Sequence, residues 1–182
     1  LLSPGSAARM AVSEMLLNIA GAQITSIDSI KCSANWMLAA KGDGGDGAWL
    51  YRAASALRDI CNALRIAIDG GKDSLSMSSN ARKQDGKEAT VFAPPQLVIA
   101  GYAPVPDIKT HITPNIKERG THLLLIDPSN GKCRLGGSAL AQVFGQLGNI
   151  PPDIENPDAL AKTFQIAQLL IQKGLVVPVV LL

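Results

Sequence analysis

The residues from Ala67 to Ser76 bring together side chains that suit a polyphosphate and its metal ion. They read Ala-Ile-Asp-Gly-Gly-Lys-Asp-Ser-Leu-Ser. Glycine lets a backbone approach a ligand closely, lysine is a point charge for phosphate, aspartate can hold a divalent cation, and serine can donate to phosphate oxygens. The spacing is not that of a Walker loop, and composition alone favours a solvated turn. The candidate binding residues are Gly70, Gly71, Lys72, Asp73, Ser74 and Ser76.

A second candidate site lies on a helix predicted over Ser6–Ala20, with Ser3 or Ser6 as its cap. Small and apolar residues dominate this helix, and Glu14 and Asn18 interrupt the pattern. They are four residues apart, so they lie on one face, one turn from each other. A carboxylate and an amide oxygen in this arrangement are ligands for a hard cation. The residues alone favour the alternative, a solvent-exposed stripe or an intrahelical Asn–Glu hydrogen bond.

The elements that would position these residues follow from apolar spacing and turn composition. A strand is predicted over Ile30–Leu38, and a helix over Trp49–Leu64. The next strand, Arg65–Asp69, is expected to end at the two glycines, which would form a turn. The charged stretch Asn80–Thr90 is interpreted as an exposed loop, and Leu97–Ala103 as a strand. The helix over Trp49–Leu64 carries an apolar stripe of Leu50, Ala53, Ala54, Leu57, Ile60 and Leu64.

The second half of the chain predicts a new unit after a proline-rich connection. The domain boundary is placed in a linker over residues 107–120, between a first lobe over 1–106 and a second over 121–182. An apolar strand is expected over Thr121–Ile126. Gly136-Gly137-Ser138 opens a helix over Ser138–Leu147, either as an anion site or as a tight entry capped by Ser138. Asn156 caps a further helix that ends at Gly174.

Composition narrows the classes of function. The chain has 182 residues, of which 47% are hydrophobic and 18% charged, as expected for a folded domain with a real core. Aromatic residues make up 4% and the net charge is +2 without a basic block, so a nucleic-acid partner is not expected. The apolar end is far shorter than the ~20 residues that span a bilayer, so a membrane partner is not expected either. Three widely spaced cysteines suggest reduced thiols in the cytoplasm.

Several motifs, in one order along the chain, resemble the phosphoribosylformylglycinamidine synthase family. The family comprises ATP- and glutamine-dependent ligases of purine biosynthesis. A shared order of separate motifs is more specific than any one of them. The motifs are Ala7–Ala20 (AARMAVSEMLLNIA), Ile30–Ala40 (IKCSANWMLAA), Ala67–Ser78, Leu97–Ala103 (LVIAGYA), His111–Pro114 (HITP) and Leu135–Gln142 (LGGSALAQ).

The resemblance implies an α+β fold. A mixed-sheet, synthetase-like N-terminal lobe would be followed by the start of an α/β C-terminal lobe, together part of the second of two such units. The implied partners are the first synthetase-like unit, a glutaminase domain and the phosphoribosyl substrate. The family's His-Asp-x-Ser-Asp-Gly-Gly turn does not follow Gly174. The chain by itself is therefore expected to be an inactive fragment of the enzyme.

The resemblance also assigns ligands. Family members hold magnesium beside a bound nucleotide, ATP or ADP, with an acidic residue and an asparagine that fall on Glu14 and Asn18. The Gly-Gly-Lys-Asp-Ser motif would contact either that nucleotide or the phosphoribosyl substrate, and no catalytic residue is assigned. The alternative is a noncatalytic nucleotide-binding scaffold. A kinase-like relative is disfavoured because Cys32–Trp36 occurs together with the Gly-Gly-Lys-Asp-Ser motif.

Overall fold

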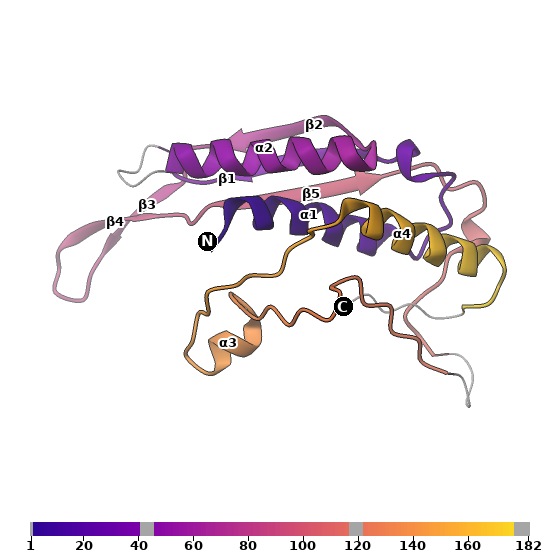
Figure 1. Ribbon diagram of the computed structural model, residues 1–182. Helices are drawn as coiled ribbons and strands as arrows, with labels where there is room; N and C mark the ends of the chain where they lie inside the picture. Colours follow the sequence, from indigo (N-terminus) through magenta and orange to yellow (C-terminus); the bar gives the residue numbers. More distant parts are fainter. Residues whose placement is uncertain (1, 41–45, 117–121, 177–182) are drawn as a thin grey trace.

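The first two-thirds of the chain fold as a three-stranded mixed sheet with helices on one face (Figure 1). The computed structural model describes residues 2–40, 46–116 and 122–176. The strand order is β2-β1-β5, where β1 is Lys31–Met37, β2 is Ala67–Ser74 and β5 is Gln96–Tyr102. Strand β1 is parallel to β2 and antiparallel to β5. This mixed sheet confirms the predicted α+β class.

Two long helices cover the sheet. Helix α1 spans Pro4–Ile19 and helix α2 spans Asp46–Leu64. Because α2 connects the parallel strands β1 and β2, it serves as the crossover that parallel pairing requires. The buried core lies between these helices and the sheet face that carries Cys32 and Ala34. The larger members of this core include Val12, Leu16, Ile30, Leu57, Ile60 and Phe164.

The helix ends follow local sequence signals. Ser3 caps α1, its hydroxyl accepting from the backbone N–H of Ser6 at 3.2 Å, with Pro4 in the first turn. Helix α4, Pro157–Gln172, is capped by Asn156 and is followed by Gly174 at φ 64°. Asn156 is the predicted cap of α4, and Ser3 is one of the two predicted caps of α1, which begins at Pro4 and not at the predicted Ser6. Along α2 the predicted stripe is buried at most positions, but Ala54 is exposed and was wrongly assigned to it.

Strand β2 contradicts the predicted turn, because it continues through both glycines to Ser74. The β1–β2 register pairs Cys32 with Ile68 and Ser33 with Gly70, so Asp69 is an extra, bulged residue. Gly71 has φ 146°, and a Cβ atom there would lie 2.0 Å from the carbonyl oxygen of Ala34. The close approach of β1 therefore requires glycine at this position.

The stretch predicted as a loop over Asn80–Thr90 is a hairpin. Strand β3, Ser78–Arg82, pairs in antiparallel fashion with β4, Glu88–Phe92, and the hairpin extends away from the three-stranded sheet (Figure 1). Of the strand predicted over Thr121–Ile126, Thr121 lies outside the described residues. The other five form no strand, and Leu123–Leu125 are exposed. That part of the prediction is wrong for the described residues.

The C-terminal part returns to the helices and is tied to α1 by polar contacts. Helix α4 packs beside α1 and α2, and Gln168 accepts from the N–H of Ile24 at 2.9 Å and donates to the carbonyl of Ala20 at 2.9 Å. Asp153 accepts two hydrogen bonds from the Arg9 guanidinium, at 2.7 and 2.8 Å. The short helix α3, Ala139–Val143, and the single turns Ile27–Ser29 and Ile108–Thr110 complete the elements. Within the described ranges, no helix combines the length and apolarity that a membrane crossing needs.

Candidate functional site

Glu14 and Asn18 line one hollow beside α1. Its volume is about 450 Å³, and Leu97 of β5 closes one side. Both polar side chains are exposed, and no hydrogen bond joins them to each other or to another described side chain. The intrahelical Asn–Glu bond, one alternative from the sequence, is therefore not formed among the described residues. The remaining lining residues come from α1: Ala7, Met10, Ala11, Ser13 and Leu17.

The donor set of this hollow fits a partly hydrated Mg²⁺ ion. A carboxylate and an amide oxygen are hard donors, and protein sites for Mg²⁺ commonly supply one or two carboxylates while phosphates and water complete the octahedron. Among the described residues, no group of three or more His, Cys, Asp or Glu side chains is gathered as a metal site. Glu14 and Asn18 would therefore hold the ion only together with oxygens from a ligand.

The Gly-Gly-Lys-Asp-Ser motif lies elsewhere, on the edge strand β2. Lys72 pairs with Asn35 of β1, which in turn pairs with Val98 of β5. Successive side chains of a strand point to opposite faces, and Ala34 is buried against the helices, so Asn35 and Lys72 belong to the open face. Neighbouring strands are about 4.8 Å apart, so β2 lies roughly 10 Å from β5. The structure does not bring Lys72 into the hollow of Glu14 and Asn18.

The other members of the motif divide between the two faces. Asp73 pairs with Trp36, whose side chain packs against the core, so Asp73 is on the helix side at the edge of the sheet. Ser74 pairs with Met37 on the open side, and Ser76 forms an isolated bridge with Ala39. Gly70 and Gly71 are exposed residues within the strand. Lys72 and Asp73 therefore point to opposite faces of the sheet and cannot bind one ligand from the same face.

A polar contact on the open face was not foreseen from the sequence. The hydroxyl of Tyr102 donates to the carboxylate of the bulged residue Asp69, across the central strand. This hydrogen bond is the main reason that the pKa of Tyr102 is raised above its ordinary value. The two residues are 33 positions apart, so no local spacing signals the contact, and only the glycine pair after Asp69 hints at an irregular strand.

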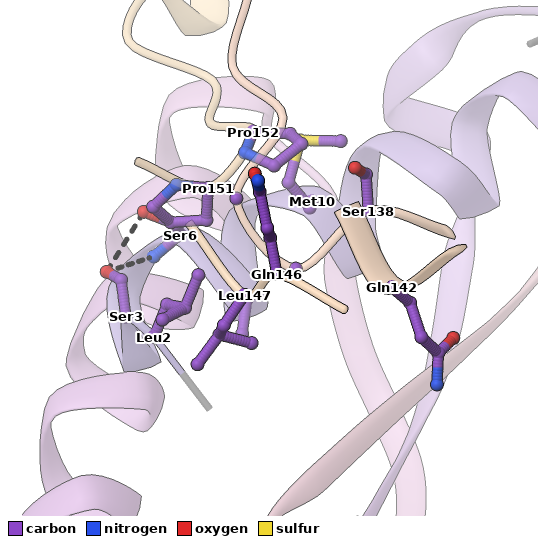
Figure 2. A pocket seen from close by; sticks show the side chains of 13 residues that line it. Leu2, Ser3, Ser6, Met10, Ser138, Gln142, Gln146, Leu147, Pro151 and Pro152 are labelled. Carbon is purple, nitrogen blue, oxygen red and sulfur yellow. Dashed lines mark hydrogen bonds between the residues drawn. The ribbon is translucent and has the colours of Figure 1, made fainter. Parts of the chain in front are cut away.

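A second hollow, whose lining residues are drawn in Figure 2, has a volume of about 470 Å³. Ala7 and Met10 line both hollows. The far wall comes from the C-terminal part of the chain, and Figure 2 shows Gln146 between Met10 and Pro151 with its amide toward Pro152. The other lining residues are Leu2, Ser3, Ser6, Gly136, Gly137, Ser138, Gln142, Leu147 and Pro152.

The Gly-Gly-Ser motif in this wall is a tight, capped helix entry rather than an anion site. The N–H of Gly136 donates to the carbonyl of Ile150 at 2.9 Å, and the N–H of Gly137 donates to that of Leu147 at 2.7 Å. The Ser138 hydroxyl accepts from the N–H of Ala141 at 3.1 Å. The backbone donors of both glycines are thus already used. Of the two alternatives, the structure favours the cap.

The polar tie between Arg9 and Asp153 holds the far wall of the second hollow against α1. Asp153 follows Pro152 directly, and the Ser6 hydroxyl lies 2.9 Å from its second oxygen. Burial raises the pKa of Asp153, but the hydrogen bonds from Arg9 and Ser6 outweigh it and hold that pKa below its usual value. The same hydrogen bond raises the pKa of Arg9, against the effect of burial. The pair is therefore ionised at neutral pH and fixes the wall in place.

These features define an α+β domain with a mixed sheet and a helix-lined polar hollow. Comparison of the sequence with family models finds the FGAR-AT PurM_N-like domain over residues 1–104. The chain belongs to this family.

Curated relatives extend the likeness over almost the whole chain. A probable phosphoribosylformylglycinamidine synthase, chloroplastic/mitochondrial, of Arabidopsis thaliana is 48% identical over 178 residues, which are 97% of this chain and 12% of the relative. The phosphoribosylformylglycinamidine synthase of Homo sapiens is 48% identical over 96% of this chain and 13% of the relative. The phosphoribosylformylglycinamidine synthase of Drosophila melanogaster is 45% identical over 97% of this chain and 13% of the relative. The chain thus spans 12–13% of the length of these relatives.

Proposed function

We propose that the chain is part of a phosphoribosylformylglycinamidine synthase, the ligase that converts formylglycinamide ribonucleotide to formylglycinamidine ribonucleotide with ATP and glutamine. Its own contribution is to bind Mg²⁺ together with the phosphates of ATP or ADP. The observation that carries this proposal is the pair of unengaged oxygen ligands, Glu14 and Asn18, in a hollow of about 450 Å³. When bound, the ion would neutralise phosphate charge in a place where the chain offers carboxylate and amide oxygens.

The remaining parts of the proposal concern partners and compartment. We infer that a first synthetase-like unit, a glutaminase domain and the phosphoribosyl substrate act together with this chain, and that the chain alone does not turn over substrate. The exposed open face of the sheet, with Val98 and Tyr102, supports the presence of covering partners. The cytoplasmic placement is supported by the free thiols of Cys32, Cys61 and Cys133.

A noncatalytic nucleotide-binding role is the second candidate, and one observation favours it. None of the eight residues that line the hollow is a lysine or arginine. Phosphoryl transfer depends on positive charge placed around the transferring group. The residues that line this hollow supply none, so here that charge would come from the metal ion. A hollow of this kind suits a nucleotide that is held rather than consumed.

Titration of the protein with Mg·ADP, followed by calorimetry, tests binding. Glu14→Gln removes the carboxylate with little change in volume, and we expect the affinity for Mg·ADP to fall by at least about tenfold, the scale at which even indirect metal contacts act. Asp59→Asn on α2 is the matched control, because Asp59 is an exposed carboxylate away from the hollow. Equal affinities for Glu14→Gln and the unmodified protein contradict the proposal. In the reassembled enzyme, the nucleotide bound at this site is measured before and after many turnovers. A nucleotide that is only held remains bound, whereas one that is consumed is lost.

A further inference from the structure

The residues from Ser129 to Lys132 form a tight turn in the C-terminal part of the chain. The N–H of Lys132 donates to the carbonyl of Ser129 at 3.3 Å, which closes the turn. Asn130 and Gly131, its two central residues, have φ angles of 59° and 74°. Positive φ at both central positions defines a type I′ turn, for which Asn-Gly is a preferred sequence. The backbone here is therefore the one that the local sequence favours.

The side-chain amide of Asn130 and the backbone nitrogen of Gly131 are both unengaged. Asn130 is the only asparagine of the chain that precedes a glycine, and both residues are exposed. Among the described residues, no hydrogen bond engages the Asn130 side chain or the Gly131 N–H. No heavy atom lies within 4 Å of a Cβ built at Gly131, so nothing crowds the backbone there. In contrast, Asn80 precedes Ala81 in β3, and its amide oxygen accepts from the Thr90 hydroxyl at 3.0 Å.

A flip of the peptide plane between Asn130 and Gly131 brings these two groups together. The flip converts a type I′ turn into a type II′ turn, in which only the first central residue keeps a positive φ. The ψ angle of Asn130 then approaches about −120°, the mirror image of the type II value. At this angle the Gly131 nitrogen is eclipsed with the Asn130 Cβ, which is its closest approach to the side-chain carbonyl carbon, Cγ. Glycine adopts the φ angles of both turn types without strain.

We propose that Asn130 is a site of spontaneous deamidation, a covalent modification of this turn. The Gly131 nitrogen attacks Cγ of Asn130, so that a new N–C bond forms, the Cγ–Nδ2 bond breaks, and ammonia leaves with the proton of the Gly131 N–H. The product is a five-membered succinimide ring. Water then opens the ring at one of its two carbonyl carbons, which gives aspartate or isoaspartate. No oxidant or reductant takes part, and the inference is independent of the proposed function.

The modified turn directly precedes two cations of an ion-pair cluster. The Lys132 ammonium lies 2.5 Å from one carboxylate oxygen of Glu155, and the Arg134 guanidinium donates to the other. Both products place a new carboxylate two residues from Lys132, and isoaspartate also lengthens the main chain by one methylene group. The new carboxylate competes with Glu155 for the Lys132 ammonium. Because the pair of Lys132 and Glu155 is exposed, we expect the modified protein to stay folded.

Peptide mapping by mass spectrometry, during incubation of the folded protein at mildly alkaline pH, tests the proposal. Asn115 is the matched control within the same chain, because it is also exposed but is followed by isoleucine. We expect Asn130 to exchange its amide for an acid at least about tenfold faster than Asn115, since only glycine leaves the attacking nitrogen unshielded by a side chain. Protein L-isoaspartate methyltransferase should then methylate the peptide that contains position 130, which shows that the succinimide ring formed.

Two comparisons decide whether the folded turn permits the reaction. Gly131→Ala should slow deamidation of Asn130 at least about tenfold, because a Cβ atom shields the nitrogen, and circular dichroism checks that the variant is folded. Equal rates at Asn130 and Asn115 overturn the proposal. Acceleration at Asn130 by more than about tenfold in urea also overturns it, because the folded turn would then block the flip of the peptide plane.

Discussion

Gly71→Ala tests whether the glycine pair serves the packing of the sheet. A Cβ atom at Gly71 would lie 2.0 Å from the carbonyl oxygen of Ala34 and 2.9 Å from its carbonyl carbon, and the backbone there has φ 146°. Alanine at such an angle costs on the order of 1–3 kcal/mol. Relief of the overlap requires β2 to move away from β1 by about an ångström, which weakens adjoining ladder bonds worth about 0.5–1.5 kcal/mol each. With two such bonds lost, we expect Gly71→Ala to lose about 2–6 kcal/mol of unfolding free energy.

Gly70→Ala is the control within the same pair. No heavy atom lies within 4 Å of a Cβ built at Gly70, and its φ is not in the left-handed region. The substitution should leave stability within about 1 kcal/mol of the unmodified protein, because alanine mainly restricts the unfolded chain.

Urea denaturation monitored by far-UV circular dichroism compares the two variants through their midpoints at equal slope. If Gly71→Ala unfolds at the same urea concentration as Gly70→Ala, the steric argument is wrong. A phosphate-binding role would then be the better reason for the glycines.

Three further predictions follow from the contacts. Asp153→Ala breaks the tie to α1 and should cost about 1.5–3 kcal/mol of unfolding free energy. The pKa of Asp153 is lower in the folded protein than in the unfolded chain, so its contribution to the unfolding free energy is complete above the unfolded pKa and is lost below about pH 4. Measuring the unfolding free energy of the unmodified protein and of Asp153→Ala as the pH is lowered checks this. Lys72→Ala should leave calorimetric Mg·ADP affinity unchanged, and a tenfold loss would place Lys72 at that site. At pH 8 a thiol reagent should label Cys133 first, since burial raises the pKa of Cys32 and Cys61 to about 11; fast labelling of all three contradicts their burial.

Elements with strong local signals could be predicted from the sequence. Ser3 and Asn156 start helices by accepting from nearby backbone N–H groups, and that preference is a property of the residue itself. The hairpin also has a local signal, Asp85-Gly86 at its tip, but the charged residues around it favour a loop by composition. The apolar run at Leu123–Leu125 has strand composition, yet strand pairing needs a neighbour, and none is present among the described residues.

The candidate site was predictable only in its helical part. Glu14 and Asn18 face one hollow because helical spacing alone sets their common face. The other polar contacts described above join residues far apart in the sequence. Arg9 bonds to Asp153, 144 positions away, and Tyr102 bonds to Asp69, 33 positions away. Such pairs depend on how the strands and the returning segment pack, which no spacing within one segment encodes.

The placement of Lys72 and Asp73 has a consequence for any ligand of their motif. As neighbours on a strand they point to opposite faces, so a phosphate bound by Lys72 lies on the open side of the sheet and a cation bound by Asp73 lies on the helix side. Glu14 and Asn18 also lie on the helix side, but at the β5 edge, two strands away from Asp73. The open side bears Asn35 beside Lys72 and leaves Tyr102 half-exposed. A substrate anion held there by Lys72 would need its remaining contacts from another part of the protein that covers this face. Lys72 is thus separated from Glu14 and Asn18 by the sheet itself, whereas Asp73 lies on their side of the sheet, at its opposite edge.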